Sequence, residues 1–297
     1  MTDTRRITAN GIDFAYLETG PADGPLALCL HGFPDHAPTY TQSGLLDALA
    51  GAGYHAVAPW LRGYSPTGLA PDGSYEVASL ALDALALADE LAGDRADAVL
   101  IGHDWGAIAA YVAVGHRPDR FAKLVAMTVP HQGALMTRFL STPEQLKRSW
   151  YIFFFQTPLA DFVVPQDDFA VIDLLWRDWS PGLVPDPAFM RALKDTLGAP
   201  GSTEAAIGSY RAMLGTTPGN PDLADVAGAG NGPIPVPTLY LHGADDGCMG
   251  IEMIDENEIR PFFPAGIDIE VVPAAGHFMH LDQPELVTRR ILQFLAP

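Results

Sequence analysis

An aspartate stands at the centre of a Gly-x-Asp-x-Gly segment that runs from Gly102 to Gly106. The apolar run before it, 97–102, predicts a buried strand, and the Ala-rich run after it, 105–116, predicts a helix. A sharp turn between a strand and a helix lifts the central side chain out of the end of the strand, as in a nucleophile elbow. The segment therefore indicates that Asp104 is a nucleophile, and the alternative is that Asp104 only caps the following helix.

The type of nucleophile restricts the type of substrate. A carboxylate that attacks an ester carbonyl forms a labile mixed anhydride, whereas attack on a saturated carbon with a leaving group forms an ordinary ester that water can hydrolyse. We therefore expect the electrophile to be an epoxide or an alkyl halide.

The elements that must position this aspartate alternate between strands and helices. Apolar runs predict strands at 5–9, 12–18, 25–31, 54–58, 97–102 and 121–128. Periodicity predicts helices at 76–92, 105–116 and about 284–295. This alternation favours a mainly parallel sheet covered on both faces. The pattern changes at about residue 133: from there to about 230, helical periodicity replaces strand character, and aromatics and prolines are frequent. We therefore divide the chain into a first core part (1–132), a helical cap (133–230) and a second core part (231–297).

Three further motifs follow strands in a fixed order. They are His31-Gly32-Phe33-Pro34, then Gly243-Ala244-Asp245-Asp246, then Gly276-His277-Phe278. Together with the elbow, they make the chain resemble the α/β-hydrolase group that contains epoxide hydrolases and haloalkane dehalogenases, with nucleophile, acid and histidine in the order used by that fold. The resemblance implies a mainly parallel eight-stranded sheet with helices on both faces and an inserted helical cap.

The resemblance also implies roles for single residues. His277 is expected to be the general base, and Asp246 is preferred over Asp245 as its acid partner because it lies at the family's usual offset in this loop. The histidines at 31 and 103 are interpreted as structural residues that hold loop backbones.

The backbone N–H groups of Phe33 and Trp105 are expected to form an oxyanion hole, and the family's pattern places a cis peptide bond before Pro34. In the cap, Tyr151 and Tyr210 match the family's two phenols, which would donate hydrogen bonds to the epoxide oxygen. The alternative is that both tyrosines are core aromatics.

A haloalkane dehalogenase with the same aspartate nucleophile is the second hypothesis. Trp105 follows the nucleophile as that family requires, but Phe33 stands where an asparagine is expected as the second halide donor. Tryptophans at 150, 176 and 179 in the cap keep this hypothesis open.

A ligand-binding protein without turnover is the third hypothesis. Such a protein is expected to lack part of the catalytic set, and no member of that set is missing from this sequence.

Composition limits the partners and the compartment. The 297 residues include 36 acidic and 17 basic side chains, a net charge of −19, which repels nucleic acid and anionic membranes. The polar start has no apolar leader and no apolar run is long enough to span a membrane, so we expect a cytoplasmic protein. A monomer and a homodimer are both left open by the sequence. Cys29 and Cys248 are interpreted as buried thiols, and the ligand spacing of a metal site is absent. We expect no cofactor, no metal and a small apolar or aromatic epoxide as substrate.

Overall fold

The computed structural model describes residues 4–296, and its centre is one eight-stranded sheet with the strand order β1-β2-β4-β3-β5-β6-β7-β8. Strand β2 pairs antiparallel with β1 and β4, and the remaining neighbours pair in parallel. The strands are β1 (Arg5–Ala9), β2 (Ile12–Thr19), β3 (Leu26–Leu30), β4 (His55–Pro59), β5 (Val99–His103), β6 (Lys123–Met127), β7 (Thr238–Gly243) and β8 (Ile267–Val272).

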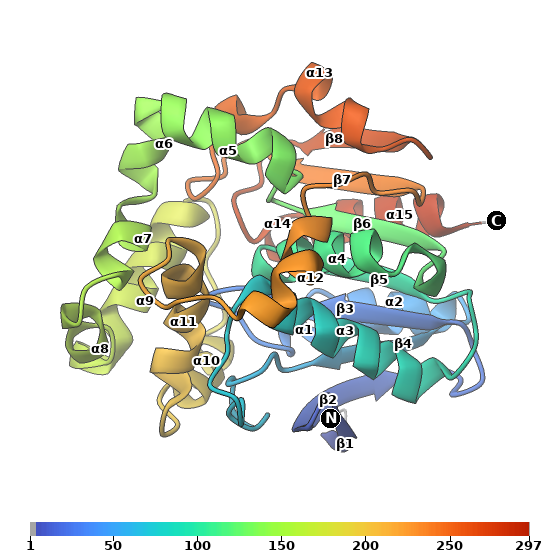
Figure 1. Ribbon diagram of the computed structural model, residues 1–297, viewed down its shortest axis with the longest axis horizontal. Coiled ribbons are helices and arrows are strands. Elements are labelled where there is room, and N and C mark those ends of the chain that lie inside the picture. The colour runs from blue at the N-terminus through green and yellow to red at the C-terminus, as the bar shows by residue number, and fades with distance from the viewer. Residues whose placement is uncertain (1–3, 297) are drawn as a thin grey trace.

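Helices cover both faces of this sheet (Figure 1). Helices α3 (Val77–Ala92), α4 (Trp105–His116) and α12 (Ala224–Ala229) lie on one face, and α2 (Leu45–Gly51) and α15 (Pro284–Leu295) lie on the other. Every residue of β3, β5 and β7 is buried. Strands buried on both faces are continuous apolar runs, which is why these segments were recognisable in the sequence.

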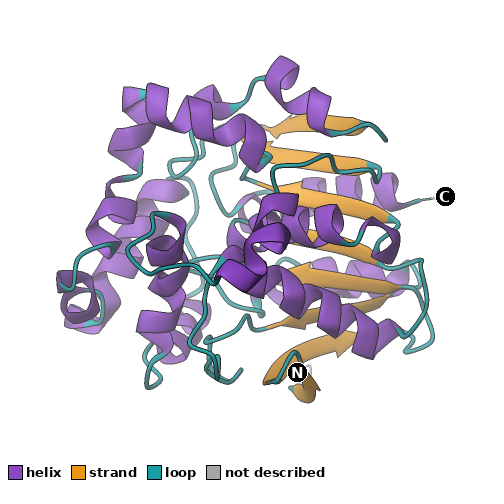
Figure 2. Cartoon of the chain, in the orientation of Figure 1, coloured by secondary structure: helices purple, strands orange, loops and turns teal. Residues whose placement is uncertain are grey.

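A group of helices between β6 and β7 stands apart from the sheet, and the strands end before it (Figure 2). These helices are α5 (Gln132–Ser141), α6 (Pro143–Arg148), α7 (Trp150–Phe155), α8 (Leu159–Val163), α9 (Gln166–Trp179), α10 (Pro187–Leu197) and α11 (Ser202–Met213). Shorter elements complete the chain: α1 (Thr39–Gln42), η1 (Pro118–Arg120), η2 (Pro221–Leu223), η3 (Ile251–Met253), α13 (Glu256–Ile259), η4 (Arg260–Phe262) and α14 (Met279–Asp282).

The predicted fold class is confirmed, with a mainly parallel eight-stranded sheet and helices on both faces. Two strands begin two residues later than predicted: the strand predicted at 97–102 occupies Val99–His103, and the strand predicted at 121–128 occupies only Lys123–Met127. The start of the second is later because Pro118–Arg120 forms a 3₁₀ turn that ends against Phe121.

Both cysteines are buried, as expected. Among the described residues, no helix combines the length and the apolar character that crossing a membrane would require.

Candidate active site

Asp104 lies at the turn between β5 and α4, with a backbone φ of 52° and ψ of −119°. Such a conformation costs a residue with a side chain about 1–3 kcal/mol and is maintained only by surrounding structure. The turn is so close to β3 that a Cβ on Gly106 would overlap the backbone of Leu30 and His31. Asp104 occupies the N-cap position of α4, but its side chain makes no capping hydrogen bond to that helix, which argues against the alternative that it serves only as a cap.

The loop after β3 holds one oxygen of this aspartate. The Phe33 N–H donates to Asp104 Oδ1 at 2.8 Å. Gly32 permits this approach, because a Cβ there would overlap the Asp104 carboxylate. The Phe33–Pro34 peptide bond is cis, as expected, and the Pro34 carbonyl accepts a hydrogen bond from Trp176 Nε1 at 2.8 Å. The predicted oxyanion donor Phe33 therefore already points at a carboxylate oxygen.

The predicted histidine and acid meet Asp104 from two other loops. His277 Nε2 lies 3.7 Å from Asp104 Oδ2, and His277 Nδ1 lies 3.1 Å from Asp246 Oδ2. The other oxygen of Asp246 accepts hydrogen bonds from the N–H groups of Cys248 and Met249, at 2.7 and 2.9 Å. Asp246, rather than its exposed neighbour at 245, therefore orients the imidazole. All three side chains of this triad are buried, each 5% exposed or less.

Two phenols from the helical cap complete the arrangement. Tyr151 of α7 and Tyr210 of α11 are 4% and 3% exposed, and their ring centroids lie 5.6 Å apart. The Tyr210 ring also contacts the Trp105 indole at 5.0 Å. The Tyr210 hydroxyl has no hydrogen-bond partner among the described residues, whereas the Tyr151 hydroxyl lies 3.3 Å from Cys248 Sγ. A buried phenol without a partner is costly in a core, which favours a role in binding a substrate oxygen.

The nucleophile and both phenols line the same small cavity. Its volume is about 100 Å³, roughly three times the ~30 Å³ that one molecule occupies in liquid water. The remaining walls are mostly apolar and include Ile108, Val129, Leu135, Met136, Phe139, Leu140, Ile152, Phe153, Met213, Leu214 and Met249. Such a cavity suits a small apolar molecule with one polar reacting group.

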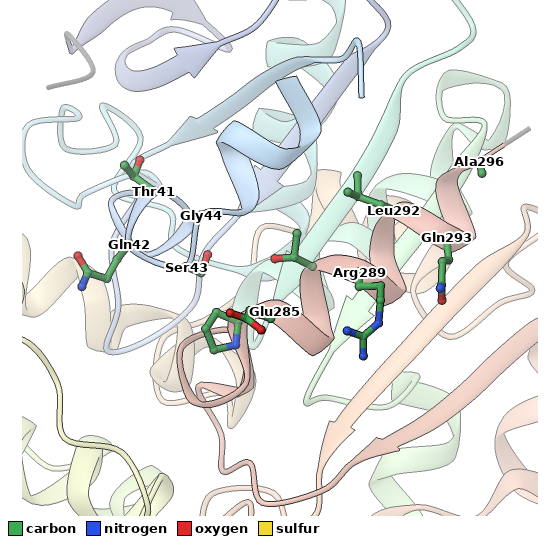
Figure 3. Close-up of a pocket in the computed structure, with 11 residues that line it drawn as sticks. Thr41, Gln42, Ser43, Gly44, Glu285, Arg289, Leu292, Gln293 and Ala296 are labelled. Carbon is green, nitrogen blue, oxygen red and sulfur yellow. The ribbon is translucent and has the colours of Figure 1, made fainter. Parts of the chain in front are cut away.

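Cavity size alone would not have located this site. A larger, open depression of about 840 Å³ lies between residues 41–44, at the end of α1, and α15, where Glu285 and Arg289 line it (Figure 3). It contains neither Asp104 nor His277. The chemistry is therefore concentrated in the smaller cavity under the cap.

Burial changes the acidity of the two reacting groups in ways that geometry explains. Burial raises the pKa of Asp104 from 3.8 to about 6, although His277 and the N–H groups of Phe33 and Trp105 act to lower it. Burial acts to lower the pKa of His277, but Cys248 and Asp246 outweigh it and hold this pKa well above its usual range. Burial and the nearby Asp104 raise the pKa of Tyr210, so this phenol keeps its proton.

A second polar layer lies beneath His277. His103 Nε2 donates to the His277 carbonyl oxygen at 3.0 Å, and the His103 and His280 rings are 4.8 Å apart. His280 Nε2 lies 2.7 Å from Thr39 Oγ1 and 3.7 Å from Asp35 Oδ2. The structural role predicted for His103 is confirmed by its bond to the loop backbone. The contribution of Asp35 was missed, because residues 35, 103 and 280 come together only through folding.

The histidine predicted to hold the loop after β3 also does so. The Leu61 N–H donates to His31 Nε2 at 3.0 Å, and His31 Nδ1 bonds the Gly32 carbonyl at 2.9 Å.

Folding also creates two buried groups of side chains whose donor atoms lie close enough to hold a metal ion. They are Asp35 with His103 and His280, and Asp246 with Cys248 and His277.

Comparison with known proteins identifies the relatives of this arrangement. Residues 27–290 match the model of the family described as "Alpha/beta hydrolase family". Epoxide hydrolase 3 of Xenopus tropicalis is 32% identical over 98% of this chain and 76% of its own length. Epoxide hydrolase A of Mycobacterium tuberculosis is 30% identical over 98% of this chain and 97% of its own length.

A solved structure gives the same result for the fold. The epoxide hydrolase of Bacillus megaterium superposes with a TM-score of 0.83 and covers 98% of this chain and 99% of its own. At 23% identity this likeness concerns the fold. The resemblance that the motifs indicated, to α/β-hydrolases of the epoxide hydrolase group, is confirmed by these relatives.

Proposed function

We propose that this chain, which belongs to the alpha/beta hydrolase family, converts an epoxide to a vicinal diol through a covalent ester on Asp104. One observation carries the proposal more than any other. A buried carboxylate has one oxygen held by a backbone N–H, and it lines an apolar cavity together with two buried phenols. The relatives that match over nearly the whole chain carry the same activity in their names.

In the first half-reaction, Asp104 Oδ2 attacks a carbon of the epoxide and Oδ1 stays on the Phe33 N–H. One ester bond forms and one carbon–oxygen bond of the ring breaks. The developing alkoxide takes a proton from a phenol, and Tyr210, whose hydroxyl has no partner, is placed to give it together with Tyr151. The product of this step is a hydroxyalkyl ester of Asp104.

In the second half-reaction, the neutral form of His277, oriented by Asp246, removes a proton from water that attacks the ester carbonyl. Because the pKa of His277 is raised, this neutral form is a strong base, and its share grows as the pH rises. The negative charge forms on Oδ1, where the N–H groups of Phe33 and Trp105 stabilise it. Collapse expels the diol, whose leaving oxygen takes the proton from His277. The second water proton, left on the Asp104 carboxyl, returns to the phenolate, so every group regains its starting state.

The three parts of the chain contribute different groups in this proposal. The core parts, 1–132 and 231–297, carry the nucleophile, the base, its acid partner and the oxyanion donors, and the cap, 133–230, carries both phenols. The apolar cavity wall supports a small apolar or aromatic epoxide as the substrate. A cytoplasmic location and a monomeric or homodimeric state remain part of the proposal, as does the absence of a nucleic-acid partner at a net charge of −19.

The haloalkane dehalogenase hypothesis needs N–H donors around a halide. Trp176 is engaged elsewhere, because its Nε1 donates to the Pro34 carbonyl, and Trp150 is 41% exposed. The side chain of Phe33 has no donor. The phenols therefore favour an alkoxide as the leaving group over a halide.

A parallel substrate panel tests the proposal. Aryl and alkyl epoxides and haloalkanes of matched size are incubated with the wild-type protein and with freshly prepared Asp104→Asn protein. We expect diol from epoxides with wild type only, and little halide from haloalkanes. Halide release that outpaces diol formation would replace the proposal by the dehalogenase reaction, and binding without any turnover would indicate a ligand-binding protein.

A further inference from the structure

The Cys248 thiol lies between the acid of the triad and the cap, and the proposed reaction gives it no task. It stands two residues after Asp246 in the loop that follows β7 and is 2% exposed. Its Sγ lies 3.3 Å from the Tyr151 hydroxyl. Gln145, a buried residue of α6, fixes the same loop by donating to the Cys248 carbonyl at 2.8 Å and accepting from the Gly250 N–H at 2.9 Å. The thiol is therefore held in one place from both sides.

Three different donor atoms converge at this position. A carboxylate oxygen of Asp246, Sγ of Cys248 and a ring nitrogen of His277 lie within 4.8 Å of one another, and all three residues are at most 3% exposed. Zinc binds sulfur at about 2.3 Å and nitrogen or oxygen at about 2.0–2.2 Å, so its tetrahedral ligands are about 3.3–3.6 Å apart. Side-chain movements of about 1 Å would bring the three atoms to that spacing.

The chemistry of the donors selects the class of ion. A thiolate with an imidazole and a carboxylate is a set that zinc and related thiophilic ions prefer, whereas magnesium and calcium require oxygen ligands. His277 offers two ring nitrogens: Nδ1 lies 3.1 Å from Asp246 Oδ2, and Nε2, which has no hydrogen-bond partner among the described residues, lies 3.7 Å from Asp104 Oδ2.

We propose that Asp246, Cys248 and His277 form a binding site for a thiophilic divalent cation of the zinc class, and that its occupation switches the enzyme off. Binding releases the thiol proton to solvent and replaces the contact between the imidazole and Asp246, or occupies the free ring nitrogen. In either geometry His277 can no longer remove a proton from water. The inhibitory effect rests on the proposed function, whereas the metal site itself does not.

Cobalt(II) tests the site without any turnover. The chain has two cysteines, so Cys29→Ala and Cys248→Ala proteins each keep one thiol, and Cys248→Ser keeps the size of the side chain. Cys29 is a suitable control because it is buried in β3, where its thiol donates to the Ala27 carbonyl at 3.9 Å. Chelator-treated wild-type and Cys29→Ala proteins should bind about one cobalt with a thiolate-to-cobalt absorption band that zinc abolishes. The band should be absent in both Cys248 variants.

Zinc inhibition tests the consequence. Diol formation by wild-type and Cys29→Ala proteins should fall on adding zinc, return on adding EDTA and not respond to magnesium. Relative to its own metal-free rate, each Cys248 variant should need about tenfold more zinc or greater for the same inhibition. A cobalt band or an unchanged zinc sensitivity in the Cys248 variants would overturn the site, as would a wild-type protein that binds no cobalt. Failure of metal-free wild type to form diol would instead overturn the proposed function and leave the cobalt result valid.

Discussion

The carboxylate of Asp104 should cost the folded protein stability at neutral pH. Asp104 is 5% exposed, and burial raises its pKa from the ordinary 3.8 to about 6. The folded protein therefore holds this proton more tightly than the unfolded chain does. The resulting stabilisation is complete below pH 3.8 and is lost as the pH rises through about 6. Above that range the ionised carboxylate is retained for chemistry at the expense of stability.

The size of the effect follows from the same two pKa values. The difference between about 6 and 3.8 amounts to about 3 kcal/mol, because each tenfold change in an equilibrium constant is worth about 1.36 kcal/mol. Asp104→Asn removes the charge and keeps an oxygen that can accept from the Phe33 N–H. We therefore expect this variant to unfold with a free energy about 3 kcal/mol higher than wild type at pH 8, and with about half of that gain at pH 5.

Urea denaturation followed by fluorescence at both pH values measures this difference, on freshly prepared protein whose mass confirms the asparagine. Asp35 is the matched control, because it is also buried but its pKa is shifted in the opposite direction. Burial acts to raise the pKa of Asp35, but hydrogen bonding and the charge of His280 outweigh it and lower this pKa. Asp35→Asn should therefore destabilise the protein at pH 8. An Asp104→Asn protein that is no more stable than wild type at pH 8, or whose gain does not depend on pH, would refute the reasoning.

Replacing His277 with Gln should stall the second half-reaction, so intact-protein mass spectrometry after mixing with styrene oxide should detect an adduct of the substrate's mass; an adduct-free variant beside an active wild type would contradict the covalent scheme. Tyr151→Phe should lower turnover about ten- to hundredfold, equivalent to about 1–3 kcal/mol, and its combination with Tyr210→Phe should nearly abolish epoxide opening in single-turnover assays. If the double variant forms diol at the wild-type rate, the phenols are only core residues. In heavy-oxygen water with enzyme in excess, the first diol should contain almost no label and the peptide with Asp104 should gain it; a labelled first diol would mean that water opens the epoxide directly. The rate of ester formation should rise with pH around a midpoint of about 6, because only the Asp104 carboxylate attacks, and a midpoint near 3.8 measured by stopped flow would show that burial does not control this group.

The cap illustrates the boundary between what local patterns and tertiary contacts determine. The change from alternating strands to helical periods after about residue 133 indicated an insertion, and helices α5 to α11 occupy it. Periodicity could not indicate which aromatic side chains face Asp104, because core and cavity aromatics obey the same spacing. The positions of Tyr151 and Tyr210 came from resemblance, and their exposure to one cavity came from the fold.

The sequence by itself determined the strands, the elbow at Asp104 and the order of nucleophile, acid and histidine. These features are local: a β-branched run, two glycines and a helix former act on a few neighbouring residues, whatever the rest of the chain does. Only the tertiary structure decided three other features. They are the distances from His277 to Asp104 and Asp246, the raised pKa of Asp104 and the position of the Cys248 thiol. The reason is that they depend on loops after different strands meeting at one edge of the sheet, and on the burial that the cap imposes there.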